Sequence, residues 1–190
     1  VVVGWGAAGA CAALEARATV ASVIVIDRFD VGVASALSGG VVYAGGGTPY
    51  QQQAGFTDTP EAMAEYLRHE VNGVVSDATL HKFCADSVAN LAWLEAHGVR
   101  FGATMTDHKT SYPPEGKFLY YSGNEVVPAY KGDKGAPAPR GHRAVAKGQS
   151  GATLYAALEA ATLRAGAPPT TPAAVTRSVR LNLAILPILR

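Results

Sequence analysis

The fold is decided by residues 1–10, VVVGWGAAGA, in which a short apolar run leads straight into a Gly-x-Gly-x-x-Gly motif. An alanine-rich pattern typical of a helix follows through residues 12–16. A second apolar run, residues 23–26, then ends in Asp27. The order is strand, glycine turn, helix, strand and acid, which is the pattern of a β-α-β unit. It predicts an α/β protein.

Each glycine of the motif has a separate task in such a unit. Gly4 allows the tight turn out of the first strand, Gly6 lets the backbone approach a pyrophosphate, and Gly9 lets the helix pack closely on the sheet. The helix N-terminus offers N–H groups and a partial positive charge to the phosphates. Asp27 can accept a hydrogen bond from a ribose hydroxyl and would repel the 2′-phosphate of NADP. The cofactor-binding residues predicted here are Gly4, Gly6, Ala7, Ala8, Gly9, Asp27 and Arg28.

A second glycine-rich stretch occupies residues 31–56 and bears on the choice of cofactor. The first motif alone fits FAD, NAD or a glycine-rich turn without a ligand. Glycines lose much backbone entropy on ordering, so this cluster favours a backbone that wraps a ligand over a flexible surface loop, and it disfavours an enzyme that uses NAD alone. A short ordered segment is expected at 41–43. The cofactor-binding residues predicted here are Ser38, Gly39, Gly40, Gly45, Gly46, Gly47 and Thr48.

A helical block follows, and capping residues mark where its helices begin. Thr59, followed by Pro60 at the first helical position, predicts one start, and Ser76 predicts the next. Apolar residues recur at helical spacing between residues 80 and 94, so a single helix is expected over that stripe. Gly98 is expected just after its end.

Residues 99–148 are irregular and rich in Gly, Pro and Tyr. A strand is expected at 118–121, a helix from residue 150 or 151 to Gly166, and a short strand at 175–179. The tyrosines of this region either pack against the helices or form an aromatic wall of an apolar substrate pocket. They are Tyr112, Tyr120, Tyr121 and Tyr130.

Several polar side chains are not assigned to a site. Asp107 and His108 are adjacent, but no nucleophile context accompanies them. His81 and His97 have no partner at metal-ligand spacing, so no metal site is expected. One small basic cluster is interpreted as a solvated face, and it comprises Arg140, His142, Arg143 and Lys147.

The composition indicates a globular protein. The chain has 190 residues, 48% of them apolar, and a net charge of +1, so it carries no electrostatic footprint for nucleic acid. No apolar run reaches the length of a membrane span, and no signal peptide is recognisable. Cys11 and Cys84 are expected to be buried thiols rather than a disulfide or metal pair, and a cytoplasmic location is expected.

The order of these elements resembles the flavoprotein family of succinate dehydrogenase and fumarate reductase. The resemblance rests on the β-α-β unit, on residues 38–40, on the pattern Leu-x-x-Leu-Glu-x-x-Gly at 91–98, and on Gly-x-x-Gly at 148–151. Within this family the chain is similar to the 3-ketosteroid dehydrogenases, especially the type that acts on the Δ4 bond of 5α-reduced 3-ketosteroids. The stretches that carry this second resemblance are SGGVVYAGGGT at 38–48, YPPEG at 112–116 and YYSGNE at 120–125.

The resemblance implies FAD as the cofactor and a Rossmann-like FAD-binding domain with an inserted, mainly helical cap region, incomplete in this chain. Residues 174 and 175 match the place where the family's backbone meets the adenine, so Val175 joins the predicted cofactor-binding residues. The implied domains are a first part of the FAD-binding domain at 1–58, a cap-like insertion at 59–145, a return to the FAD-binding domain at 146–180 and an atypical tail at 181–190.

The implied reaction is a flavin-dependent desaturation beside a steroid ketone, with an external electron acceptor. The family's substrate-side tyrosines lie downstream of the matched region, so no residue here is assigned a catalytic role. The last ten residues depart from the family pattern, which suggests a cut or frame-shifted product. Two alternatives remain open: a fumarate-reductase-like enzyme, which needs arginines for a substrate carboxylate, and a truncated, inactive nucleotide-binding remnant. The oligomeric state is left open.

Overall fold

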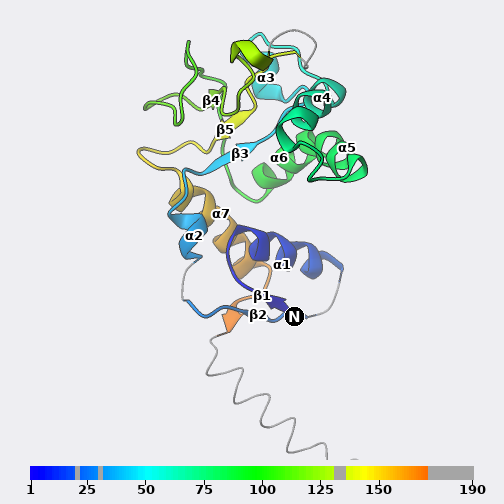
Figure 1. The fold of residues 1–190 in the computed structure, drawn as a ribbon. Helices are drawn as coiled ribbons and strands as arrows, with labels where there is room; N and C mark the ends of the chain where they lie inside the picture. The colour runs from blue at the N-terminus through cyan, green and yellow to red at the C-terminus, as the bar shows by residue number, and fades with distance from the viewer. Residues whose placement is uncertain (20–21, 30–31, 131–135, 171–190) are drawn as a thin grey trace, which may run out of the picture. The chain divides into compact units, whose positions relative to one another are not determined.

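The structure is a computed structural model that describes residues 1–19, 22–29, 32–130 and 136–170 (Figure 1). The chain divides into two compact units. The first unit combines Val1–Leu37 with the described part of Tyr155–Arg190, and the second unit is Ser38–Leu154.

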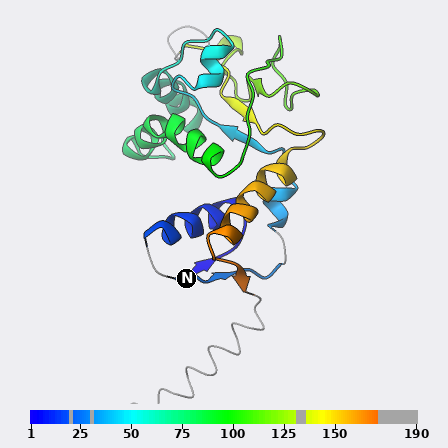
Figure 2. The same ribbon diagram turned by 180° about the vertical axis from the view of Figure 1, so that it is seen from behind.

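The first unit is built on a sheet of three parallel strands. Its elements are β1 (Val2–Val3), α1 (Ala7–Thr19), β2 (Val25–Ile26), α2 (Val33–Ala36), the C-terminal part of α7 (Gly151–Arg164) and β6 (Pro169–Thr170). Val25 pairs with both Val2 and Pro169, so β2 is the central strand. In both ribbon views α1 and the end of α7 lie on the same face of this sheet (Figures 1 and 2). The predicted α/β class and β-α-β start are confirmed.

Helix α1 approaches the sheet closely because its inner face carries small residues. Ala10 and Ala13 are fully buried. A Cβ atom at Gly9 would lie only 1.8 Å from the carbonyl oxygen of Gly4. Gly4 itself has a φ of 92°, in the left-handed region that favours glycine. The structure therefore confirms the tight turn predicted at Gly4 and the close packing predicted at Gly9.

The second unit combines helices with a three-stranded antiparallel sheet. Its elements are β3 (Val41–Tyr43), α3 (Pro49–Gln53), α4 (Pro60–Val71), α5 (Asp77–Ala85), α6 (Ser87–Ala96), β4 (Leu119–Tyr120), the 3-10 helix η1 (Pro128–Tyr130) and β5 (Gly141–Arg143). The central strand is β5, in which His142 pairs with Val42 of β3 and with Leu119 of β4. In both views α4, α5 and α6 gather on one side of this sheet and the loops around β4 lie on the other (Figures 1 and 2).

The predicted helix starts are confirmed, but the expected single helix over residues 80–94 is wrong. The side chains of Thr59 and Ser76 accept hydrogen bonds from the backbone at the starts of α4 and α5. The apolar stripe is instead divided between α5 and α6 at Asp86, whose N–H bonds back to Lys82. The division turns Ser87 inward, where it is buried and accepts a hydrogen bond from the N–H of Gly45. Periodicity alone does not reveal such a break, because the spacing of the stripe continues across it.

The strand predicted at 118–121 is confirmed in part, because Leu119–Tyr120 forms β4, and the short ordered segment expected at 41–43 is the strand β3. Helix α7 ends close to Gly166, which has a φ of 73°. Two strands were missed. One is β5, which lies within the predicted basic cluster. The other is β6, whose first residue is Pro169; proline cannot donate to the hydrogen-bond ladder of a sheet but is tolerated at a strand's first position. The strand predicted at 175–179 lies outside the described residues, as do Ala174, Val175 and the tail.

Two further expectations concern the cysteines and membrane spans. Cys84 is buried and Cys11 is partly buried, and both are free thiols, with a pKa that burial raises. Among the helices of the described ranges, none has both the length and the apolar character that a membrane crossing requires.

Candidate cofactor-binding site

Two side chains from other segments accept hydrogen bonds from the turn between β1 and α1. The carboxylate of Asp27 accepts a hydrogen bond from the N–H of Trp5. The hydroxyl of Ser35 accepts one from the N–H of Ala7, at 2.9 Å. A Cβ atom at Gly4 would meet no heavy atom within 4 Å. One side of the turn is therefore fixed by these contacts, and the backbone at Gly4 is open on the other.

Asp27 is placed at the carboxyl end of β2, next to this turn. Its second oxygen accepts a hydrogen bond from the N–H of Phe29 at 2.9 Å. The hydrogen bonds from Phe29 and Trp5 lower the pKa of Asp27, so the carboxylate is ionised at neutral pH. A carboxylate oxygen can accept more than one hydrogen bond, so Asp27 keeps capacity for a ligand hydroxyl. Arg28 is exposed, and its guanidinium lies 4.6 Å from the centre of the Phe29 ring.

Tyr155, on α7, also supports the turn, and sequence reasoning missed it. Its hydroxyl donates a hydrogen bond to the carbonyl oxygen of Trp5. Its ring meets the buried Trp5 ring edge to face, with 6.1 Å between the centroids. A Cβ atom at Gly32 would lie 2.3 Å from this ring, so glycine is required there. No local motif points to Tyr155, because its partners lie near the opposite end of the chain.

The segment Ser38–Gly40 is packed tightly against two other parts of the second unit. A Cβ atom at Gly40, whose φ is 63°, would lie 2.4 Å from the backbone of Ser150. A Cβ atom at Gly39 would lie 2.8 Å from the ring of Tyr112. The hydroxyl of Ser38 accepts a hydrogen bond from the N–H of Gly40 at 3.2 Å. The glycines here are therefore explained by close backbone approach within the protein.

The segment Gly45–Thr48 directs its backbone N–H groups to side chains of its own unit. These groups donate to Ser87 Oγ from Gly45, to Asp58 Oδ2 from Gly46, and to Gln51 Oε1 from both Gly47 and Thr48, at distances of 2.9 to 3.1 Å. A Cβ atom at Gly45 would lie 2.7 Å from Asp58 Oδ2. The cofactor role of Gly45, Gly46, Gly47 and Thr48 stays a prediction, and it would have to use atoms other than these N–H groups.

The interpretation of the basic cluster as a solvated face is wrong for three of its four members. Arg140, His142 and Arg143 are fully buried, and only Lys147 is exposed. Three basic residues within four positions favour a surface because desolvating a charge is costly. In the folded chain each of the three finds partners that are distant in sequence, which the residue order does not reveal.

Arg140 forms a buried ion pair with Asp58. Its Nε and Nη2 atoms donate to the two carboxylate oxygens at 2.9 and 2.7 Å, and neither side chain is exposed. Burial by itself raises the pKa of Asp58, but the hydrogen bonds and charge of Arg140, with the donors Gly46 and Gln51, outweigh it and the pKa is lowered. The ion pair thereby anchors the Gly45–Thr48 segment, because Asp58 also accepts the N–H of Gly46.

His142 is neutral and its tautomer follows from its partners. Its Nδ1 lies 3.2 Å from the carbonyl oxygen of Arg140, which can only accept, so Nδ1 carries the hydrogen. Its Nε2 therefore accepts from the hydroxyl of Thr48 at 2.9 Å. Burial lowers the pKa of His142 to about 4.

This pKa predicts a specific loss of stability in acid. Because the pKa of His142 is about 4 in the folded chain and 6.5 in the unfolded chain, the unfolded chain binds the extra proton between these values. The contribution of His142 to stability should be nearly constant above pH 7 and should fall by roughly 3 kcal/mol as the pH drops to 4. Urea unfolding at pH 7 and pH 4 measures this difference. His142→Gln should reduce the difference in unfolding free energy between pH 7 and pH 4. His81→Gln changes an exposed histidine and should leave this difference unchanged. Equal pH dependence in both variants would contradict a neutral His142.

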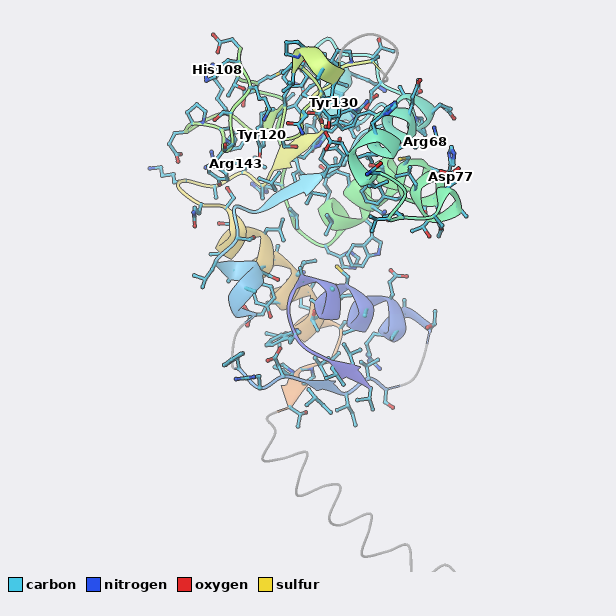
Figure 3. The ribbon with its side chains drawn as sticks, viewed as in Figure 1. Arg68, Asp77, His108, Tyr120, Tyr130 and Arg143 are labelled. Carbon is cyan, nitrogen blue, oxygen red and sulfur yellow. The ribbon has the colours of Figure 1, made fainter. Side chains whose placement is uncertain are left out.

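The remaining tyrosines of residues 99–148 are largely engaged with the protein itself. Tyr120 is buried, and the ring of Tyr130 lies 5.9 Å from that of Tyr66 (Figure 3). The ring of Tyr121 meets that of Phe56 edge to face. The aromatic wall of a substrate pocket stays a prediction.

A pocket of about 270 Å³ occurs in the second unit. Its lining comes from the end of α6, the residues after β5 and the start of α7. The lining residues are Gly98, Val99, Arg100, Ala144, Val145, Thr153 and Leu154.

Comparison with known proteins decides the family. The FAD binding domain family model matches residues 1–178. The chain belongs to this FAD-binding family. It is 59% identical over 182 residues to a 3-oxo-5-alpha-steroid 4-dehydrogenase of Comamonas testosteroni, covering 95% of this chain and 34% of that protein. The chain thus spans about a third of the length of this curated relative.

Solved structures agree with the family assignment. The fold is similar to that of a 3-ketosteroid-Δ4-(5α)-dehydrogenase from Rhodococcus jostii RHA1, solved in complex with 4-androstene-3,17-dione. The TM-score is 0.84 at 32% identity, covering 90% of this chain and 36% of that chain. A flavocytochrome c3 fumarate reductase shares the fold with a TM-score of 0.64 at 24% identity, over 90% of this chain and 26% of that one. FAD is thus the cofactor indicated for this family member.

The residues of the first unit fit a dinucleotide of this kind. The turn between β1 and α1 leaves the backbone open at Gly4, and the contacts of Trp5 and Ala7 fix its course. An ionised Asp27 with spare acceptor capacity lies beside it.

Three histidines of the second unit, His81, His97 and His108, contact neighbouring side chains. His108 Nδ1 lies 2.6 Å from Asp107, and both side chains are exposed (Figure 3). His81 contacts Arg68, and the His97 ring stacks on that of Trp93. Across the described ranges, no group of three or more His, Cys, Asp or Glu side chains is arranged to hold a metal ion.

Proposed function

We propose that this chain is the FAD-binding part of a flavin-dependent oxidoreductase that desaturates 3-ketosteroids. The observation that carries the proposal is the 59% identity to the Comamonas 3-oxo-5-alpha-steroid 4-dehydrogenase. The β1–α1 turn with Asp27 supports it from the structure. Bound FAD would accept the hydride that leaves the steroid, while a base removes the proton next to the ketone. No residue of this chain is assigned as that base.

The chain's own residues would bind and orient the cofactor. The backbone of Gly4, Gly6, Ala7, Ala8 and Gly9 would contact the pyrophosphate at the N-terminus of α1, where the helix dipole favours negative charge. Asp27 would accept from a hydroxyl of the adenosine ribose, with Arg28 beside it. The Ser38–Gly40 and Gly45–Thr48 segments would run along the cofactor. Val175 and Ala174, outside the described residues, would meet the adenine.

Two further parts of the proposal concern the protein's surroundings. An external electron acceptor would reoxidise the flavin after each turnover. A cytoplasmic location is supported by the two free thiols, Cys11 and Cys84, since reducing compartments keep thiols unpaired.

Binding of FAD to the purified chain tests the proposal. We expect the chain to retain or take up FAD, seen as flavin absorbance that co-elutes with the protein. Asp27→Asn should weaken FAD binding about tenfold or more, because a hydrogen bond to a charged group is worth about 1.5–3 kcal/mol. Glu61→Gln, an exposed acid on α4, is the matched control and should bind like the wild type. A colourless protein that takes up no FAD would instead favour the inactive remnant.

The two arginines of the predicted basic cluster, Arg140 and Arg143, do not support the fumarate-reductase-like alternative. Arg140 is committed to Asp58, and Arg143 is buried among backbone carbonyls. Neither guanidinium is free for a substrate carboxylate. Assays of the longer protein that contains this chain, on a 3-ketosteroid and on fumarate with an artificial electron acceptor, separate the two. Turnover of fumarate alone would refute the steroid assignment.

A further inference from the structure

The Ser38–Gly40 segment is held by a framework that the cofactor motif does not include. The N–H of Gly151 donates to the carbonyl oxygen of Ser38 at 3.1 Å, and the N–H of Ala144 donates to that of Gly40 at 2.9 Å. The segment therefore takes its course from the residues that follow β5 and from the start of α7.

Tyr112 connects the middle of this segment to the same region. Its hydroxyl lies 2.9 Å from the carbonyl oxygen of Gly39 and 3.3 Å from that of Gly148, and it accepts from the N–H of Ser150 at 3.1 Å. Its ring packs against Gly39 so closely that no side chain fits there. The hydroxyl and the ring of Tyr112 therefore both restrict the position of Gly39.

Arg143 in turn fixes both Tyr112 and residues 146–150. Its fully buried guanidinium lies 4.9 Å from the centre of the Tyr112 ring (Figure 3). It donates to Ser150 Oγ at 2.9 Å. It also donates to the carbonyl oxygens of Pro113, Pro114, Ala146 and Gly148.

Glu115 completes the framework at its exposed edge. Its Oε1 accepts from the N–H of Gly148 at 2.7 Å and lies 3.4 Å from Arg143 Nη2. A planar guanidinium offers five N–H donors to these acceptors, whereas a lysine ammonium is a point charge with three donors. The number of carbonyl acceptors around Arg143 therefore requires arginine rather than any cation.

We propose that Tyr112 and Arg143 are positioning residues that set the backbone of Ser38–Gly40 for contact with FAD. The inference rests on the proposed function, because it assigns Ser38–Gly40 to the cofactor. Neither residue needs to touch the cofactor. They act by holding the carbonyl oxygen of Gly39 and residues 148–151 in one arrangement, so that the segment is ordered before FAD binds.

The test compares Tyr112→Phe with Tyr66→Phe in the purified chain. Tyr66 is the matched control, because its buried hydroxyl also accepts from a backbone N–H, that of Asn124, and donates to a second partner, Glu70. Three properties are measured: the FAD dissociation constant, the visible spectrum of the bound flavin, and hydrogen exchange in peptides that cover residues 38–40 and 148–151. Arg143→Lys is the second variant.

In Tyr112→Phe we expect about tenfold weaker FAD binding, an altered flavin spectrum and faster exchange at residues 38–40. Tyr66→Phe should keep the wild-type values of all three. Wild-type exchange and FAD binding in Tyr112→Phe would overturn the inference while leaving the proposed function intact. If the wild type binds no FAD, the proposed function and the cofactor role fail together, and the exchange data alone then decide whether Tyr112 holds the segment. Arg143→Lys should show the same changes as Tyr112→Phe, and wild-type behaviour in a folded Arg143→Lys would count against the framework.

Discussion

Asp58→Asn should lower the free energy of unfolding by about 3–5 kcal/mol. The substitution keeps the shape of the side chain but removes its charge. The Arg140 guanidinium would then remain buried without the Asp58 counterion. Its own Nη1 atom already has no hydrogen-bond partner. Asparagine also offers only one acceptor oxygen, where Asp58 now uses two.

Asp77→Asn is the matched control for this experiment. Asp77 pairs with Arg68 at 3.3 Å, but both side chains are largely exposed (Figure 3). An exposed pair contributes about 1 kcal/mol or less. Urea unfolding of the wild type and the two variants at neutral pH gives the comparison. Similar losses in both variants would contradict the uncompensated buried charge expected on Arg140 in Asp58→Asn.

The effect of Asp58→Asn should also depend on pH in a defined direction. The pKa of Asp58 is lowered in the folded chain, so its contribution to stability is present above the unfolded value of about 3.9 and is lost as the pH falls through the folded value. The difference between wild type and variant should therefore be constant at neutral pH and shrink in strong acid. A difference that grows as the pH falls would contradict this assignment of charge.

Gly9→Ala should disrupt the first unit, even though alanine is the better helix former. Its Cβ would lie 1.8 Å from the carbonyl oxygen and 2.9 Å from the carbonyl carbon of Gly4. Both are backbone atoms, so α1 would have to move away from β1. We expect a loss of about 1–3 kcal/mol or more in unfolding free energy, against a helix-propensity gain of about 1 kcal/mol, together with loss of FAD binding. Urea unfolding and FAD titration measure the two effects.

Gly6→Ala is the graded comparison for Gly9→Ala. The nearest atom to its Cβ is the Ser35 hydroxyl oxygen at 3.2 Å, which belongs to a side chain and needs to move by only a few tenths of an ångström. The unfolding free energy of Gly6→Ala should therefore stay close to that of the wild type. Its FAD affinity should still fall if the backbone at Gly6 approaches the pyrophosphate. Equal loss of stability in the two variants would refute the steric explanation given for Gly9.

Sequence reasoning succeeded where a feature depends on near neighbours. The turn at Gly4, the caps at Thr59 and Ser76 and the helix end near Gly166 all follow from local sterics and local hydrogen bonds. It failed at the break between α5 and α6, where the apolar spacing continues but the backbone turns.

The buried basic residues Arg140 and His142 show the other kind of failure. A charge is expected at the surface unless partners offset its desolvation, and those partners lie far away in the chain. Asp58 and Arg140 are 82 residues apart. His142 and Thr48 are 94 residues apart. A single sequence gives no indication that such residues meet.

By itself, the sequence determined the β-α-β start, the glycine turn with Asp27 and the resemblance that the FAD-binding family match confirmed. These features are local, because the residues that specify a glycine turn and the helix after it contact one another within one short stretch of sequence. Only the tertiary structure decided what surrounds the later glycines: the Asp58–Arg140 pair, and Tyr112 with Arg143. The physical reason is that a charge can be buried only where distant segments supply hydrogen-bond partners. A glycine is likewise required only where a distant segment packs against it. Folding of the whole chain brings these segments together.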